Sequence, residues 1–170
     1  MASNYWMFVE TKENAQITRE KGYSIFGMSP KYKKRAQRMQ PNDRVLFYER
    51  SEMIWTASAT ISSKYFEDTS EIWPTKGNPN EYKIRINLKP NYILDQSEFI
   101  QGLQVGASLE YVKKWAPEKW HLAFWDTLHL LPQRDFKYLE DEMRRVKTGI
   151  KADAIIERSK KPRTKRVQNE

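Results

Sequence analysis

The sequence contains no cysteine and only two histidines among its 170 residues. The absence of cysteine excludes disulfides, a thiolate nucleophile and every metal site that needs a cysteine ligand. The two histidines, His121 and His129, lack the spacing of a histidine-based zinc motif. The sequence therefore predicts no metal and no cofactor, and its lack of cysteine fits a reducing compartment.

Long apolar runs are absent as well. No stretch approaches the length of a membrane-spanning helix, and Met1-Ala2-Ser3-Asn4 lacks the basic and apolar regions of a signal peptide. We therefore expect a cytoplasmic protein without a membrane partner, and most simply a monomer.

Catalytic signatures are also missing. The sequence has no P-loop, no glycine-rich dinucleotide fingerprint, no G-x-S-x-G motif and no zinc-deaminase signature. The acidic run Glu140-Asp141-Glu142 is more typical of a solvated helix face than of a catalytic carboxylate pair. We predict that the protein is not an enzyme and assign no catalytic residue.

Positive charge is abundant but unevenly placed. Residues 1–143 hold 20 Lys and Arg against 19 Asp and Glu, whereas residues 144–170 hold 10 against 3, so the C-terminal segment carries +7 of the net charge of +8. Such asymmetry favours a polyanionic partner, above all nucleic acid, although a basic tail can also serve solubility alone. We divide the chain into a domain over residues 1–148 and a basic extension, partly helical or disordered, over residues 149–170.

Hydrophobic patterning predicts the elements of the domain. A continuous apolar run at residues 5–9, a core segment at 44–48 and alternating segments at 53–62 and 82–88 indicate strands, and 23–26 indicates a further short one. Helices are expected over residues 12–21, after Ser29-Pro30, and over 136–146. About five or six strands mixed with peripheral helices predict an α+β fold built on a small, partly open β-barrel.

The segment from Gly22 to Tyr48 is the most informative. An apolar turn, Ile25-Phe26-Gly27-Met28-Ser29-Pro30, leads into five cations in eight residues with no acidic residue from position 22 to position 40. An aromatic ring at a glycine turn can stack a flat ligand, and adjacent cations can bind phosphates. The predicted phosphate-binding residues are Lys31, Lys33, Lys34, Arg35 and Arg38, although the same five could form a solvated helix face.

Several of these segments resemble the EVE-domain family. The matching features are Asn4-Tyr5-Trp6, Phe26-Gly27-Met28 before a basic segment, the strand entry from Pro41 to Tyr48, Ile72-Trp73-Pro74 before Tyr82–Ile86, and Trp120–Phe124. In order and spacing they are most similar to uncharacterised archaeal members of the family, over roughly residues 4–143. Two departures are Phe26, where a tryptophan is usual, and Asn42, where a glycine is usual.

The resemblance implies a PUA-like fold related to YTH domains, which bind N6-methyladenine in RNA, and a pocket for a modified base such as modified cytosine in DNA. It places Phe26 and Trp73 as the two walls that sandwich the base. It also implies the remaining pocket residues, namely Glu10, Thr11, Gly27, Met28, Ser29 and, at the rim, Trp120.

Three interpretations of function remain open from the sequence. The leading hypothesis is a non-catalytic module that binds DNA or RNA and captures a modified base. The second is an RNA-binding module of the same fold that does not sense modification. The third is an enzyme acting on a small nucleotide-like molecule. Phe26 could equally be a plain core residue, and Trp73 a lid over the end of the barrel.

Overall fold

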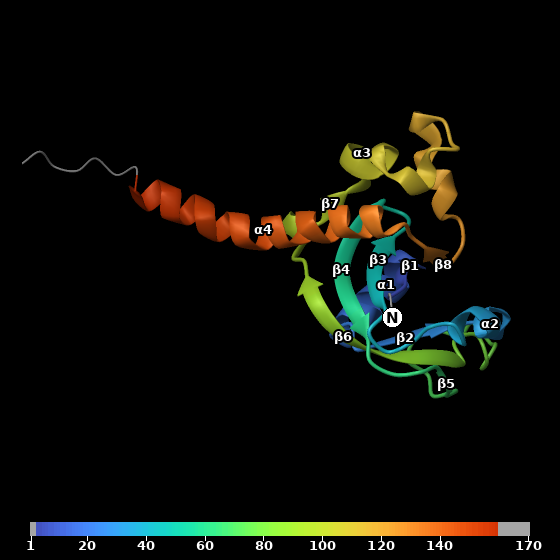
Figure 1. Cartoon of the computed structure of the whole chain (residues 1–170). Helices are drawn as coiled ribbons and strands as arrows, with labels where there is room; N and C mark the ends of the chain where they lie inside the picture. Colours follow the sequence, from blue (N-terminus) through green and yellow to red (C-terminus); the bar gives the residue numbers. More distant parts are fainter. Residues whose placement is uncertain (1–2, 160–170) are drawn as a thin grey trace, which may run out of the picture.

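The architecture is a curled, mixed β-sheet with helices and loops packed around it (Figure 1). The computed structural model describes residues 3–159, and from residue 150 on it describes the backbone of one helix only. The strands are β1 (Tyr5–Glu10), β2 (Ile25–Met28), β3 (Arg44–Glu49), β4 (Ile54–Ile61), β5 (Phe66–Glu67), β6 (Ile84–Ile93), β7 (Ile100–Gln101) and β8 (Leu128–Leu130).

The helices lie around this sheet. The α-helices are α1 (Lys12–Glu20), α2 (Lys33–Ala36), α3 (Gly102–Val105) and α4 (Gln133–Ser159). The short 3-10 segments are η1 (Pro30–Tyr32), η2 (Gln96–Glu98), η3 (Gly106–Ser108), η4 (Glu110–Val112) and η5 (Pro117–Phe124). None of the helices described is long and apolar enough to cross a membrane.

The strand order β2-β6-β4-β3-β1-β8 leaves β2 and β8 as the two edges of the curled sheet. β1 and β3 run parallel with Trp6 opposite Val45, and the other strand pairs are antiparallel. β6 is shared, because its first half pairs with β2 and its second half with β4. The predicted α+β, partly open barrel is confirmed. We call the gap between the edges β2 and β8 the seam.

Two apolar cores lie on opposite sides of the sheet. Successive residues of a strand point to opposite faces, so β1 sends Trp6 and Phe8 into one core and Met7 and Val9 into the other. The first core also holds Phe26 and the second holds Trp120 and the apolar side of α4. This division decides which aromatic residues can share a site.

The turn after α1 places the start of β2 later than residue 23, where the sequence pattern predicted it. Thr11 caps α1 by accepting a hydrogen bond from the Asn14 amide, as expected. Gly22 and Tyr23 both adopt positive φ angles, 66° and 53°. Two successive left-handed residues cannot belong to a strand, so β2 begins only at Ile25.

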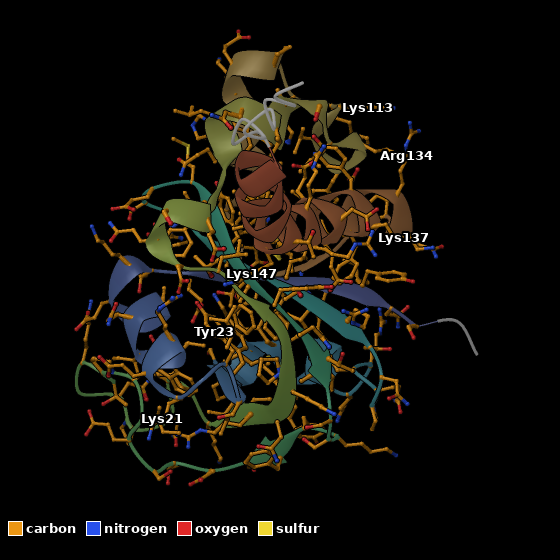
Figure 2. All side chains as sticks on the ribbon, turned by 90° about the vertical axis from the view of Figure 1, so that its left-hand side faces the viewer. Lys21, Tyr23, Lys113, Arg134, Lys137 and Lys147 are labelled. Atoms are coloured by element: carbon orange, nitrogen blue, oxygen red, sulfur yellow. The ribbon has the colours of Figure 1, made fainter. Side chains whose placement is uncertain are left out.

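The last helix docks on the second core as its pattern predicted. Phe136, Leu139 and Met143 are buried there, at helical spacing. Lys147 contributes an ion pair to Glu98 of η2 at 2.6 Å, and Figure 2, which looks along α4, shows Lys147 between this helix and the barrel. α4 continues without interruption through the predicted domain boundary at residue 148. The part of the basic extension beyond residue 159 lies outside the described residues.

Candidate functional site

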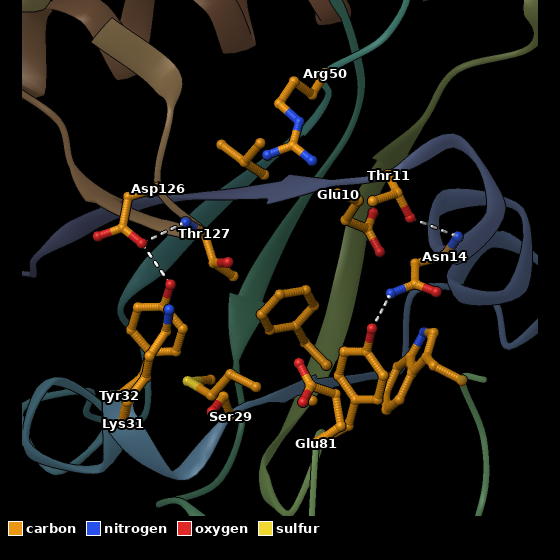
Figure 3. Close-up of a pocket in the computed structure, with 16 residues that line it drawn as sticks. Glu10, Thr11, Asn14, Ser29, Lys31, Tyr32, Arg50, Glu81, Asp126 and Thr127 are labelled. Atoms are coloured by element: carbon orange, nitrogen blue, oxygen red, sulfur yellow. Dashed lines mark hydrogen bonds between the residues drawn. The ribbon is translucent and has the colours of Figure 1, made fainter. Parts of the chain in front are cut away.

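A cavity of about 150 Å³ opens at the seam, and we call it the seam pocket. A cavity of about this volume can hold a benzene-sized ring. It lies between the end of β1, the edge strand β2, the loop at residues 73–82 and the segment before β8 (Figure 3). The lining residues used below are Glu10, Thr11, Asn14, Phe26, Gly27, Met28, Ser29, Lys31, Tyr32, Arg50, Trp73, Glu81, Tyr82, Asp126 and Thr127.

Side chains rather than backbone hydrogen bonds close the seam next to this pocket. The Asp126 carboxylate accepts hydrogen bonds from the Tyr32 hydroxyl at 2.5 Å and the Thr127 amide at 2.8 Å, and it pairs with Arg35 at 3.0 Å (Figure 3). Burial alone would raise the pKa of Asp126, but the bonds from Tyr32, Thr127 and Arg35 outweigh it and lower the pKa. Asp126 is therefore ionised, and it links η1 and α2 to the start of β8.

We expect Asp126→Ala to destabilise the fold by about 1–3 kcal/mol, because it removes hydrogen bonds to a charged group and leaves the buried Tyr32 hydroxyl without its acceptor. Urea unfolding measures this change. Glu67→Ala is the matched control, since the Lys33–Glu67 pair is exposed on both sides and should be worth only about 0–1 kcal/mol. Equal losses in the two variants would show that Asp126 is not a closing contact.

Phe26 and Trp73 both line the seam pocket, but they do not face each other as parallel walls. Their ring centroids are 6.5 Å apart and the planes are inclined by 64°, whereas two faces enclosing a base would be parallel and about 7 Å apart, twice the van der Waals contact distance. Phe26 instead stacks on Phe8 across the seam, with centroids 4.2 Å apart. The predicted sandwich is therefore wrong for this geometry, and the two rings form an apolar corner.

Gly27 is the residue that lets Trp73 reach this corner. A Cβ atom at position 27 would lie 2.5 Å from Cζ3 of Trp73 and 3.0 Å from Cβ of Tyr82. The Trp73 indole is held on its other sides by Tyr82, with centroids 5.6 Å apart, and by the Arg85 guanidinium. The glycine is thus required by close packing across β2 rather than by its backbone angle.

Glu10 is the most unusual polar group of the seam pocket. Its carboxyl is buried, and burial raises its pKa to about 8, with the hydrogen bond from Thr18 opposing the rise and the neighbouring charge of Glu49 adding to it. The Thr18 hydroxyl accepts from Trp73 Nε1 at 3.1 Å, so its own proton goes to Glu10 Oε2 at 2.5 Å. Glu10 Oε1 has no hydrogen-bond partner among the described residues, so this atom is available to a ligand.

The remaining polar wall comes from α1 and the loop before β6. Asn14 donates its side-chain amide to the Tyr82 hydroxyl at 2.8 Å, which leaves the carbonyl oxygen of that amide available. In Figure 3 the carboxyl group of Glu10 points from β1 toward the pocket interior, close to Asn14 and the aromatic rings. Hydrogen-bond donors and acceptors thus meet an apolar corner in one small cavity.

The five predicted phosphate-binding residues do not behave alike. Lys33 and Arg35 are paired with the protein's own carboxylates, Glu67 and Asp126. Lys31, Lys34 and Arg38 are exposed and form no ion pair with any residue described. The segment is also not one cationic helix, because the η1 turn precedes the four-residue α2. Among these five, only Lys31 lines the seam pocket.

Trp120 does not belong to the seam pocket, and its placement at the rim is corrected. It lies in the second core, on the opposite face of the sheet, and stacks on Trp55 with centroids 6.3 Å apart. Gly102 and Gly106 pack against its ring so tightly that a Cβ atom on either would come within 2.6 Å of it. Trp120 is therefore a structural residue.

Sequence patterns missed more than half of the polar lining. Arg50 reaches the seam pocket because the parallel pairing of β1 and β3 brings the end of β3 beside Glu10, and the Arg50 amide donates to the Glu10 carbonyl at 3.0 Å. Asn14 could have been found, since it lies one helical turn after Thr11. Nothing local marks Tyr82 or Asp126, because their partners Asn14 and Tyr32 are distant from them in sequence.

Comparison with known proteins gives consistent matches. A family model described as the EVE domain matches residues 4–127. A UPF0310 protein of Pyrococcus horikoshii is 24% identical over 147 residues, which cover 80% of this chain and 96% of that protein.

Two solved structures share the fold. The YTH domain of the Zygosaccharomyces rouxii MRB1 protein, solved in complex with N6-methyladenosine RNA, superposes with a TM-score of 0.59 at 14% identity and covers 82% of this chain and 85% of that one. A hypothetical protein from Leishmania major superposes with a TM-score of 0.53 at 16% identity and covers 85% and 96%. At these identities the similarity establishes the fold alone.

Proposed function

This chain belongs to the EVE-domain family, and from that premise we propose that it binds nucleic acid and captures one modified base in the seam pocket, without catalysis. The observation that carries the proposal is the pocket itself, where the apolar corner of Phe26 and Trp73 faces the carboxyl of Glu10. The similarity in fold to a YTH domain solved with N6-methyladenosine RNA supports a base as the occupant.

The chemistry of neutral Glu10 favours particular bases. A protonated carboxyl presents a donor beside an acceptor. Cytosine and adenine present the complementary pair on their Watson–Crick edges, a ring nitrogen that accepts and an amino group that donates. Uracil and guanine present a ring N–H at the corresponding position and would meet the Glu10 proton with a proton of their own. We therefore infer a cytosine or adenine derivative.

The apolar corner would supply the preference for modification. A methyl group placed against Phe26, Met28 and Trp73 would leave water, which contributes about 0.8 kcal/mol for each group buried, or roughly a fourfold gain in affinity. Bases in a single strand reach such a pocket without the cost of opening a duplex, which is a few kcal/mol. Lys31 and Arg50, at the rim, would bind the adjoining phosphates.

Fluorescence anisotropy tests this proposal with short single strands of RNA and DNA that carry one central cytosine, 5-methylcytosine, 5-hydroxymethylcytosine, adenine or N6-methyladenine. We expect one modified strand to bind several-fold more tightly than its unmodified counterpart, and Asn14→Ala to reduce this ratio. Lys31→Ala should instead weaken all strands alike and reduce the slope of log affinity against log salt by about one. Equal affinities for all bases, insensitive to Asn14→Ala, would contradict the proposal.

One observation favours a second candidate function, an enzyme acting on a nucleotide-like molecule. A buried carboxyl with a raised pKa in a cavity is what a general acid requires. Incubation of a nucleoside and nucleotide library with the protein distinguishes the two functions. Turnover that Glu10→Gln abolishes would establish the enzyme, and tight binding without turnover would establish the binding module.

A further inference from the structure

A second cavity, of about 330 Å³, lies on the other side of Asp126 from the seam pocket. Asp126 lines both cavities, so they are neighbours on one surface. We call the second one the Trp125 cavity, since Trp125 lines it. The Trp125 side chain is 72% exposed, more than any other large aromatic side chain among the described residues. The side chains used in the argument are Arg35, Arg38, Trp125, His129 and Leu130.

From these side chains we propose that the Trp125 cavity binds the nucleotide next to the captured base, with its base stacked on Trp125 and its phosphate between Arg35 and Arg38. This inference rests on the proposed function, because it assigns a place to the neighbour of the base in the seam pocket. It extends that function by adding a second subsite, which contacts base and backbone without reading base identity.

The chemistry of the cavity suits a nucleotide. An exposed indole offers a flat face on which any base can stack, and the exposed apolar side chain of Leu130 lines the same cavity. Arg38 has no ion pair with a described residue. Arg35 is fixed in place by Asp126 at 3.0 Å and by the Leu128 carbonyl at 3.2 Å, yet half of its side chain stays exposed.

His129 does not compete for this role. Its Nε2 lies 2.8 Å from the Asp126 carbonyl oxygen, which can only accept, so Nε2 carries the proton. Nδ1 then accepts from the Tyr111 hydroxyl at 2.7 Å. Burial lowers the pKa of His129, and both nitrogens are occupied, which makes it a neutral part of the cavity floor. The cationic groups that face a ligand here are therefore the two arginines.

Trp125→Ala and Arg38→Ala test the proposal with the preferred strand from the anisotropy series, with the same strand lacking the bases on either side of the central one, and with the corresponding free nucleoside. We expect Trp125→Ala to weaken the intact strand about 5- to 100-fold, the range for one stacked base, and to leave the nucleoside unaffected. Removing the flanking base that stacks on Trp125 should weaken strand binding by the wild type by a similar factor, so that the wild type and Trp125→Ala bind this strand with equal affinity. Arg38→Ala should reduce the slope of affinity against salt.

Trp115→Ala and Arg134→Ala are the matched controls. Trp115 is also exposed, at 41%, and the Arg134 side chain points outward from α4 (Figure 2); neither lines the two cavities. Unchanged strand affinity in Trp125→Ala, with discrimination of the modified base intact, would overturn the subsite and leave the proposed function standing. Absence of discrimination in the wild type would overturn the proposed function, and the subsite with it.

Discussion

The wild-type protein should lose stability as the pH rises from about 4.5 to about 8, and the Glu10→Gln variant should not. Folding raises the pKa of Glu10 from 4.5 to about 8, so between these values the folded state holds a proton that the unfolded state has released. The unfolded state then binds fewer protons, and the free energy of unfolding falls with increasing pH. A pKa difference of one between the two states corresponds to about 1.4 kcal/mol, so the full loss is on the order of a few kcal/mol.

Urea unfolding of both proteins at about pH 5 and about pH 9 measures this difference. Glutamine keeps the acceptor for Thr18 and has no titrating proton. The variant should therefore match the wild type near pH 5 and exceed it near pH 9. Glu13→Gln is the matched control, because Glu13 is exposed on α1. Parallel stability profiles for the wild type and Glu10→Gln would refute the assignment of a buried neutral carboxyl.

The same substitution separates the base-binding hypothesis from a purely structural role for Glu10. Loss of the Glu10 proton above about pH 8 would remove the donor that faces a cytosine or adenine ring nitrogen, and binding by the wild type should weaken in this range. The glutamine amide also presents a donor beside an acceptor, so Glu10→Gln should bind at neutral pH and stay bound at high pH.

Gly27→Ala, which adds one methyl group beside the seam pocket, should lower both the stability of the fold and the affinity for a base. The new Cβ atom would lie 2.5 Å from Cζ3 of Trp73, and Trp73 cannot withdraw without breaking its hydrogen bond to Thr18. Overpacking of this kind costs about 1–3 kcal/mol. We also expect base affinity to fall at least tenfold, because Trp73 would be displaced toward the cavity or away from its corner. Urea unfolding and anisotropy measure the two effects.

A double-mutant cycle with Trp73→Phe identifies the cause. The smaller ring should relieve the collision, so adding alanine at position 27 should cost less in that background. Gly149→Ala is the control for alanine itself, since no atom lies within 4 Å of a Cβ there, and in the interior of α4 it should stabilise by up to about 1 kcal/mol. The same cost for Gly27→Ala in the wild-type and Trp73→Phe backgrounds would exclude close packing as its origin.

The sequence predicted those helices, strands and caps that depend only on residues close together in the chain. The alternation in β4, the Thr11 cap of α1 and the apolar spacing of Phe136, Leu139 and Met143 depend on neighbouring residues only, and each was predicted from the sequence. β6 begins two residues later than predicted, at Ile84, and continues past Pro90 to Ile93. The missing N–H of Pro90 is tolerated at the irregular pairing with Ala59. This pairing depends on the neighbouring strand β4, so the alternating pattern of β6 alone could not predict where β6 ends.

The site was only half predictable for the same reason. Phe26 was marked by the glycine turn before the cationic segment, and the resemblance to EVE domains pointed to Glu10, Gly27 and Trp73. The angle between the two rings, the assignment of Trp120 to the other core and the partners of Lys33 and Arg35 all depend on the curl of the sheet. Contacts such as Tyr32 to Asp126, 94 residues apart in sequence, carry no local signal.

The way the seam is closed also sets how the protein can move. No hydrogen-bonded ladder joins β2 to β8 among the described strands, so widening the entrance breaks side-chain contacts, namely those of Tyr32 and Arg35 with Asp126, that of Arg35 with the Leu128 carbonyl, and the stacking of Phe26 on Phe8. Local opening of this kind is governed by how few contacts must break. The entrance can therefore widen for a bulky ligand while every strand of the sheet keeps its hydrogen-bonded neighbours.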